Sequence, residues 1–266
     1  MVLGQAPGRF PMPWTVDYVD RHREFVGDVL DSADILARFA RGLELPAGYG
    51  IGLDERCVEY PWLVAQQLSG RTLDAGSALN HEHVLDRVQP LVSELHITTL
   101  TPEEKAFTER GVSYIYADLR ELPFRDGWYD TIVSISTIEH VGMDNSLYGA
   151  EAGSAEDPDT ELRAALAELK RVLAPHGAML VTVPYGVQEN HGWFRQFDHA
   201  DIDELVAAVQ PRHVVERVYS YARNGWQISD RRRAASARYH DHAALGRVPE
   251  DLAAAARAVV CLRLSF

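Results

Sequence analysis

The chain has 266 residues, of which 46% are hydrophobic, so it is long enough to bury the full core of one large α/β domain, and global disorder is excluded. Lys and Arg number 26 against 39 Asp and Glu, which gives a net charge of −13. This acidic balance argues against a nucleic-acid partner, which requires a basic face, and favours a neutral or cationic small molecule.

The termini and the cysteines predict a cytoplasmic protein. The amino-terminal text MVLGQAPGRFPMPW has neither a basic start nor a long apolar run, so it does not predict a signal peptide. No segment approaches the roughly 20 apolar residues of a membrane span. Cys57 and Cys261 stand far apart without a CxxC motif, which predicts neither a disulfide framework nor a zinc knuckle.

Residues 1–69 predict a helical extension. Residues 1–14 are rich in Gly and Pro and predict an irregular arm, and a helix is predicted from its cap Thr15 to about Gly42. The text CVEYPWLVAQQL predicts a second, shorter helix. The extension either covers the mouth of a ligand site or forms a homodimer contact, and the sequence leaves both open.

Residues 70–266 predict one α/β domain, because short β-rich runs alternate with helices. The predicted strands are RTLDAGS, LHITTLT, SYIYADL, YDTIVSIST, AMLVTVPYG, HVVERVYSYAR and ARAVVCLRLSF. The predicted helices are TPEEKAFTERG (capped by Thr101 and stopped by Gly111), DTELRAALAELKRVLAPHG (ended by Pro175 and Gly177) and DHADIDELVAAV. We therefore expect a doubly wound, seven-stranded, mostly parallel sheet. No clear helix separates the last two strands, so the final strand is expected antiparallel at the sheet edge.

The strand–helix junctions are the candidate ligand site, because ligands of such sheets bind at the carboxyl ends of the strands. In LDAGSALN, Gly76 allows the backbone to approach a ligand closely, and Asp74 orients the loop or meets a cationic group. In ADL, Asp118 either accepts a hydrogen bond from an exocyclic amine or caps a turn.

Taken in order, these elements resemble the class I S-adenosylmethionine-dependent methyltransferase family, in its small-molecule, type-11-like branch. The resemblance runs from about Thr72 to Leu205, and its most specific text is LPFRDGWYDTIVSISTIEHV. It implies a Rossmann-like fold with S-adenosyl-L-methionine as the cofactor. It also implies methyl transfer to a hydroxyl, or less often to nitrogen or carbon, of a small metabolite such as a sugar-like compound or natural product.

The resemblance further implies roles at matching positions. Residues that would contact the cofactor are Asp74, Gly76 and Ser77 at its methionine end, Thr99 at its ribose, Asp118 and Leu119 at its adenine, and Ser136 and Thr137 under its sulfonium. Glu139 and His140 would follow on the acceptor side. His140 is either the general base for an oxygen acceptor or a residue that caps or packs at the strand end without titrating.

Two positions depart from the family pattern. Ala78 and Asn80 replace the later glycines of the loop, and Thr99 stands where the family has a carboxylate for the ribose hydroxyls. A threonine offers only one oxygen, so Glu103 or Glu82 are candidate substitutes.

Other readings of the same residues stay open. Histidines and carboxylates at one sheet edge could hold a divalent metal (His81, Glu82, His83, Glu139, His140, Asp144 and His191), but their spacing matches no metal signature and none is predicted. Three segments could shape the acceptor pocket: the lid-like GMDNSLYGAEAGSAEDPD, PYGVQENHGWFRQFD with its aromatic residues, and NGWQISDRRRAAS.

Two rival functions also remain. The first is a non-catalytic relative that serves as a binding protein, which Thr99 favours. The second is a nicotinamide oxidoreductase, which the missing Gly-x-Gly-x-x-Gly disfavours.

Overall fold

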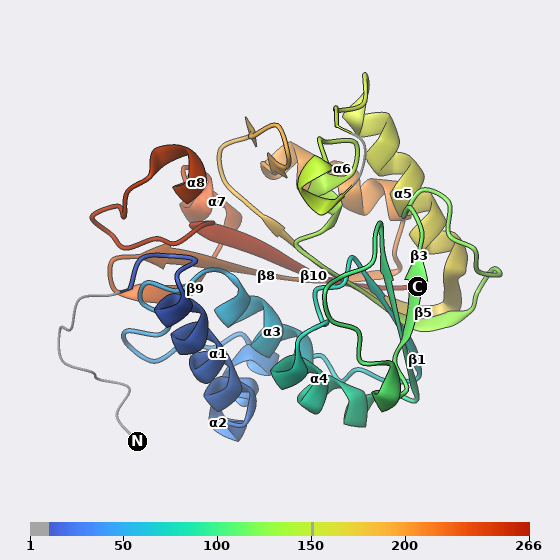
Figure 1. Ribbon diagram of the computed structural model, residues 1–266, viewed down its shortest axis with the longest axis horizontal. Helices are drawn as coiled ribbons and strands as arrows, with labels where there is room; N and C mark the ends of the chain where they lie inside the picture. Colours follow the sequence, from blue (N-terminus) through green and yellow to red (C-terminus); the bar gives the residue numbers. More distant parts are fainter. Residues whose placement is uncertain (1–10, 150–151) are drawn as a thin grey trace. The chain divides into compact units, whose positions relative to one another are not determined.

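The computed structural model describes residues 11–149 and 152–266 (Figure 1). The first ten residues of the predicted arm, and residues 150–151 of the predicted lid, lie outside this description. The chain forms two compact units. Unit 1 comprises Met1–Gln66, Pro184–Val187 and Arg217–Val260, and unit 2 comprises Gln67–Val183, Gln188–Glu216 and Cys261–Phe266.

The amino-terminal part of unit 1 is helical, as predicted, but its first helix is broken. The prediction of one helix from Thr15 to Gly42 is wrong, because α1 spans Val16–Leu30 and α2 spans Ala33–Arg41. Ser32 has an extended backbone and accepts a hydrogen bond from the Ile35 amide, so it caps α2 and separates the two helices. Gly42 ends α2 in the left-handed conformation, as expected. The second predicted helix is α3 (Arg56–Val64).

Large aromatic side chains fill the core of unit 1. Those buried to below 2% exposure are Tyr18, Phe39, Tyr49, Tyr60, Trp62, Tyr185, Tyr219 and Trp226. The Trp226 indole donates a hydrogen bond to the Leu53 carbonyl at 3.1 Å. Trp226 lies on β9 (Gly225–Ser229), which pairs antiparallel with β8 (His213–Ala222). Two short helices, α7 (Arg231–Ala234) and α8 (His242–Leu245), follow in the chain.

Unit 2 contains the parallel strands that carry the predicted junctions. These are β1 (Arg71–Ala75), β2 (Glu94–Thr99), β3 (Ser113–Tyr116), β4 (Tyr129–Ile135) and β5 (Leu173–Pro184). They pair in parallel in the order β3-β2-β1-β4-β5. β4 is buried at nearly every position, as expected for a central parallel strand with both faces covered. The mostly parallel α/β fold is therefore confirmed.

The carboxyl-terminal strands differ from the prediction in number and order. The sheet has eight strands in the order β3-β2-β1-β4-β5-β10-β8-β9, and not seven. β10 (Ala258–Ser265) is antiparallel to β5, because the Phe266 amide bonds the Gly177 carbonyl and the Tyr185 amide bonds the Ala258 carbonyl. The antiparallel final strand is confirmed, but it does not form the edge. β9 forms the edge because a short turn after β8 folds it back onto that strand.

Helices cover both sides of the strands in unit 2. Figure 1 shows α4 (Glu82–Val88) on one side, and α5 (Pro158–Val172) and α6 (His199–Val209) on the other. Asp198 and Asp201 form a capping box at the start of α6. α5 ends at Val172 rather than at the predicted Pro175 and Gly177, because β5 already begins at Leu173.

The predicted helix TPEEKAFTERG is wrong. Its residues form a loop with only a 3-10 turn at Thr108–Arg110, closed by Gly111 in the left-handed conformation. Side-chain contacts explain the loop, because the Asn80 amide bonds both Glu103 and the Lys105 carbonyl. Bonds of this kind compete with the helical backbone. Among the described residues, no helix combines the length and the apolar character that a membrane span requires.

Candidate functional site

The turn after β1 is a tight cradle. The buried Asp74 carboxylate accepts a hydrogen bond from the Leu79 amide at 2.7 Å, which closes the turn between them. Gly76 (φ +123°) and Ser77 (φ +63°) both have positive φ angles. A Cβ atom at Gly76 would lie 2.1 Å from Cγ2 of Thr137, so only glycine permits this approach.

The turn after β4 meets that cradle. Ser136 has a φ of +40°, which is uncommon for a residue other than glycine, and its amide bonds the Thr182 carbonyl at 3.0 Å. The Thr137 hydroxyl donates to the Ile135 carbonyl at 3.1 Å. β1 and β4 are parallel neighbours, so both turns lie at the same edge of the sheet. Backbone strain at two facing turns is typical of a functional site.

The ends of β2 and β3 carry the remaining predicted cofactor residues. Thr99 ends β2 half-buried, and its carbonyl accepts from the Ala117 amide at 3.1 Å. Asp118 forms an ion pair with Arg120 at 2.6 Å, and Arg120 also bonds Glu161 at 2.5 Å. Burial raises the pKa of Asp118, but hydrogen bonds from Arg120 outweigh burial and leave the pKa below its ordinary value. A ligand that contacts the Asp118 carboxylate therefore competes with Arg120. Its neighbour, Leu119, is buried.

His140 has a defined tautomer. It ends the 3-10 turn Ile138–His140, and its Nδ1 lies 2.8 Å from the Trp193 carbonyl oxygen. A carbonyl only accepts hydrogen bonds, so Nδ1 carries the proton. The basic lone pair of the neutral ring is therefore on Nε2. Glu139, in the same turn, is buried to 2% exposure.

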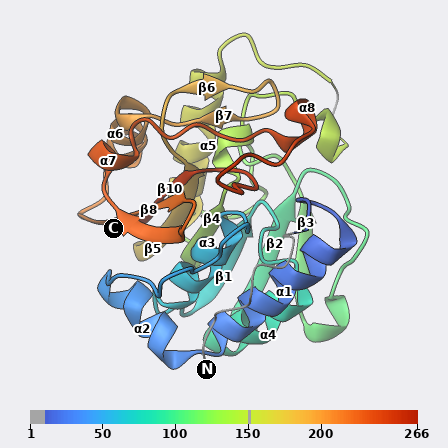
Figure 2. The same ribbon diagram turned by 90° about the vertical axis from the view of Figure 1, so that its left-hand side faces the viewer.

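Aromatic rings surround His140. The His140 ring centroid lies 5.3 Å from that of Tyr148 and 5.2 Å from that of Trp193. Trp193 lies in the loop between β6 (Glu189–Asn190) and β7 (Arg195–Gln196), which pair as a short hairpin (Figure 2). In the same loop, His191 stacks on Phe194 with centroids 4.5 Å apart.

Of the three segments predicted to shape the acceptor pocket, two contribute residues to the cluster around His140. The hairpin brings Trp193 and Phe194 to His140, and the lid segment contributes Tyr148. Tyr185 and Trp226 belong to unit 1, where the Tyr185 hydroxyl donates to the Arg231 carbonyl at 3.2 Å.

The structural role of Asn80 is not predicted from the sequence, where this residue only stands in place of a glycine. Asn80 is buried to 6% exposure. Besides its bonds to Glu103 and Lys105, its amide oxygen accepts from the Tyr114 hydroxyl at 2.7 Å. A buried polar side chain with several hydrogen-bonding atoms requires such partners. An asparagine in this turn is the one feature of the sequence that could have indicated them.

The alternative metal site has no ligand set in the structure. Within residues 11–149 and 152–266, no group of three or more His, Cys, Asp or Glu side chains is arranged to hold a metal ion. The His81 and His83 rings lie 5.8 Å apart, centroid to centroid.

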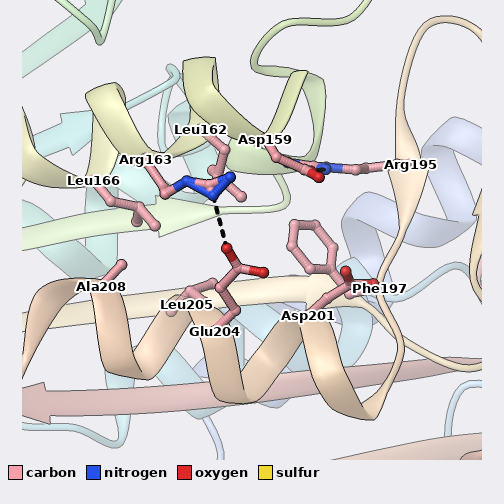
Figure 3. Close-up of a pocket in the computed structure, with 10 residues that line it drawn as sticks. All are labelled: Asp159, Leu162, Arg163, Leu166, Arg195, Phe197, Asp201, Glu204, Leu205 and Ala208. Carbon is pink, nitrogen blue, oxygen red and sulfur yellow. Dashed lines mark hydrogen bonds and ion pairs between the residues drawn. The ribbon is translucent and has the colours of Figure 1, made fainter. Parts of the chain in front are cut away.

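Two pockets of unit 2 lie away from these turns. One, between α5 and α6, has a volume of only about 20 Å³, and the ion pair between Arg163 and Glu204 crosses it (Figure 3). That volume is far below the ~300–1,000 Å³ of ligand sites. The other has about 440 Å³ and lies at the amino-terminal ends of β1 and β4, lined by residues such as Gly70, Asp130 and Arg263. It is thus at the opposite end of the strands from the cradle.

Comparison with known proteins identifies the segment that carries the cradle. A family model described as "Methyltransferase domain" matches residues 75–181. This segment runs from the end of β1 into β5 and includes His140. No curated protein matches the chain.

Several solved structures are similar to the chain. The YcgJ protein of Bacillus subtilis is 16% identical, with a TM-score of 0.47 over 77% of this chain and 97% of its own. The 1,6-didemethyltoxoflavin-N1-methyltransferase of Burkholderia thailandensis, solved with S-adenosylhomocysteine, is 14% identical, with a TM-score of 0.47 over 98% of this chain and 94% of its own. The N-methyltransferase NodS of Bradyrhizobium japonicum WM9, also solved with S-adenosylhomocysteine, is 14% identical, with a TM-score of 0.47 over 92% and 97%. At this level of similarity, none of them indicates an acceptor.

Proposed function

We propose that this chain, whose residues 75–181 match a methyltransferase-domain family model, transfers a methyl group from S-adenosylmethionine to a hydroxyl of a small metabolite. The observation that carries the proposal is the meeting of the turns after β1 and β4 at Gly76 and Thr137, next to the turn that ends at His140. These turns and the candidate base thus follow the carboxyl ends of the neighbouring strands β1 and β4.

The cofactor would be held by residues at the carboxyl ends of the strands. They are Asp74, Gly76 and Ser77 after β1, Thr99 after β2, Asp118 and Leu119 after β3, and Ser136 and Thr137 after β4. The turns at Gly76 and Ser136 fit this role, because their positive φ angles hold the backbone in strained conformations of the kind that gather at functional sites. The bound cofactor supplies an already activated methyl group, so the protein contributes mainly alignment of the reactants.

His140 is the proposed general base. Its bond to the Trp193 carbonyl places the basic lone pair on Nε2, which would take the proton of the acceptor hydroxyl. The rings of Tyr148 and Trp193 lie next to the His140 ring and suit a sugar-like or aromatic acceptor, because aromatic surfaces beside polar groups are typical of such sites. Glu139 is the second acceptor-side residue in this proposal.

The test of the base is a comparison of His140→Gln with wild type once an acceptor has been found. General-base catalysis typically contributes about 10²–10⁴-fold, so we expect a loss of kcat in that range with unchanged affinity for S-adenosylhomocysteine. Full turnover by the His140→Gln and His140→Ala variants contradicts the base role.

A non-catalytic binding protein is the second candidate function. Two observations favour it: β2 ends in Thr99 rather than in a carboxylate, and Arg120 already engages the Asp118 carboxylate. Titration with S-adenosylhomocysteine separates the two functions, because this candidate requires that the cofactor does not bind.

The remaining proposals concern the whole chain. We assign residues 1–69 to a helical extension and 70–266 to the methyltransferase domain. The boundary near residue 70 is supported by the end of α3 at Val64 and the start of β1 at Arg71. The compact units differ from this assignment, because Pro184–Val187 and Arg217–Val260 belong to unit 1 together with the extension. A cytoplasmic location and a homodimer stay predictions from the sequence.

A further inference from the structure

The loop after β2 is fixed to the loop after β1 by one side chain. Asn80 Nδ2 donates to Glu103 Oε2 at 2.5 Å and to the Lys105 carbonyl at 2.9 Å. Asn80 Oδ1 accepts from the Tyr114 hydroxyl, and the Tyr114 oxygen in turn accepts from the Phe107 amide at 2.8 Å. These bonds hold residues 103–107 in a loop, whereas their sequence predicts a helix.

The network places a carboxylate beside the cradle. Asn80 follows Ser77 by three positions and is buried, whereas Glu103 is exposed to solvent. Within the described part of the chain, Glu103 uses only Oε2 for hydrogen bonding, since its sole bond there is the one to Asn80. The second carboxylate oxygen is therefore available to a ligand.

We propose that Glu103, positioned by Asn80, binds the ribose hydroxyls of the cofactor, and this inference rests on the proposed function. A ribose diol presents two O–H donors, and the free oxygen of an ionised carboxylate has two acceptor sites, so Glu103 Oε1 can accept from both hydroxyls. The oxygen of Thr99, at the end of β2, is neutral. The carboxylate that would bind the ribose is thus that of Glu103, four residues beyond the end of β2, and the bond to Asn80 fixes it there.

Glu82 is the rival for this role and lacks such an anchor. It is the exposed first residue of α4, and in the described residues its carboxylate has no hydrogen-bonded partner. Ordering a free glutamate side chain on binding costs rotamer entropy, which the bond to Asn80 has already reduced for Glu103. The structure therefore favours Glu103 over Glu82.

Isothermal titration of the full chain tests the proposal. The ligands are S-adenosylhomocysteine and its 2′-deoxy and 3′-deoxy analogues, and the variants are Glu103→Gln, Glu82→Gln and Glu104→Gln. The glutamine at position 103 still accepts a bond from Asn80, so the loop and the Tm without ligand should be retained.

We expect Glu103→Gln to bind S-adenosylhomocysteine about 10- to 100-fold more weakly, as for the loss of hydrogen bonds to a charged acceptor. We also expect this variant to discriminate less than wild type against at least one deoxy analogue. The Glu82→Gln and Glu104→Gln variants should behave as wild type.

Asn80 is a positioning residue in this account, so its effect should pass through Glu103. Asn80→Ala should weaken cofactor binding in the wild-type background, and weaken it much less in the Glu103→Gln background. An equal loss in both backgrounds overturns the positioning role.

The ribose assignment is overturned if Glu103→Gln keeps both wild-type affinity and wild-type discrimination against the deoxy analogues. It is also overturned if Glu82→Gln shows the loss instead. Failure of the wild type to bind S-adenosylhomocysteine is a different result, because it removes the cofactor assignment itself together with this inference.

Discussion

At the scale of single residues, the contact between Gly76 and Thr137 defines the cradle. Gly76→Ala would place a methyl group 2.1 Å from the Thr137 side chain, at a φ of +123°. We expect the free energy of unfolding to fall by about 2–4 kcal/mol, from backbone strain and overpacking together, and affinity for S-adenosylhomocysteine to fall as well. Urea unfolding and calorimetry measure the two effects.

Gly111→Ala is the matched control for that variant. Gly111 also has a positive φ, +79°, but an added Cβ atom there meets no atom within 4 Å. Only the conformational cost of about 1–2 kcal/mol applies, and cofactor binding should be unchanged. Equal effects of the two substitutions would mean that the approach of Gly76 to Thr137 has no role.

Glu55 should make the stability of unit 1 depend on pH. Burial, together with the nearby Asp54 and Glu59 carboxylates, raises the pKa of Glu55 from an ordinary 4.5 to about 8. The folded protein therefore binds this proton more tightly than the unfolded chain. The stability that Glu55 contributes is fully present below pH 4.5 and is lost as the pH rises to about 8.

Glu55→Gln removes this dependence. Relative to wild type, the free energy of unfolding of the variant should increase between pH 5 and 8 with a slope of up to about 1.4 kcal/mol per pH unit. Urea unfolding across this range measures the slope, with Glu24→Gln on the exposed face of α1 as the control. A difference between Glu55→Gln and wild type that is constant with pH would contradict the account.

At the scale of elements, capping sets the limits of the helices. Asp198 accepts hydrogen bonds from the Ala200 and Asp201 amides at the start of α6, so Asp198→Ala should cost about 1–2 kcal/mol of stability. Glu204→Gln, on the same helix, removes only the surface ion pair with Arg163 and should cost less than about 1 kcal/mol. Thermal unfolding compares the two variants, and the reverse order of effects would count against the capping box.

The elements also show what sequence patterns can predict. Buried apolar runs predict β4 and β5, and Asp198 predicts the start of α6, because these signals are local. The text TPEEKAFTERG carries helix signals at both ends, yet its conformation is decided by Asn80, which lies more than 20 positions earlier. The break at Ser32 was missed because the helical pattern continues on both sides of the cap. The short strand β9 was missed because it depends on pairing with β8.

In the candidate site, too, some features can be predicted from the sequence and others depend on distant contacts. The order of the junctions along the chain predicts which residues share one sheet edge, because parallel strands bring their carboxyl ends together. The sequence does not predict the ion pair of Asp118 with Arg120, or the ring contacts of His140, because both depend on side-chain packing.

At the scale of the whole molecule, we conclude that the carboxyl edge of the parallel strands binds S-adenosylmethionine. The eight-stranded order, the methyltransferase-domain match over residues 75–181 and the cradle at Gly76 all support it. The most direct measurement is isothermal titration of the purified wild-type chain with S-adenosylhomocysteine, with NAD and NADP as controls. We expect micromolar binding of S-adenosylhomocysteine and no binding of either nicotinamide cofactor. Absence of S-adenosylhomocysteine binding, with and without magnesium, would contradict it and favour the non-catalytic binding protein.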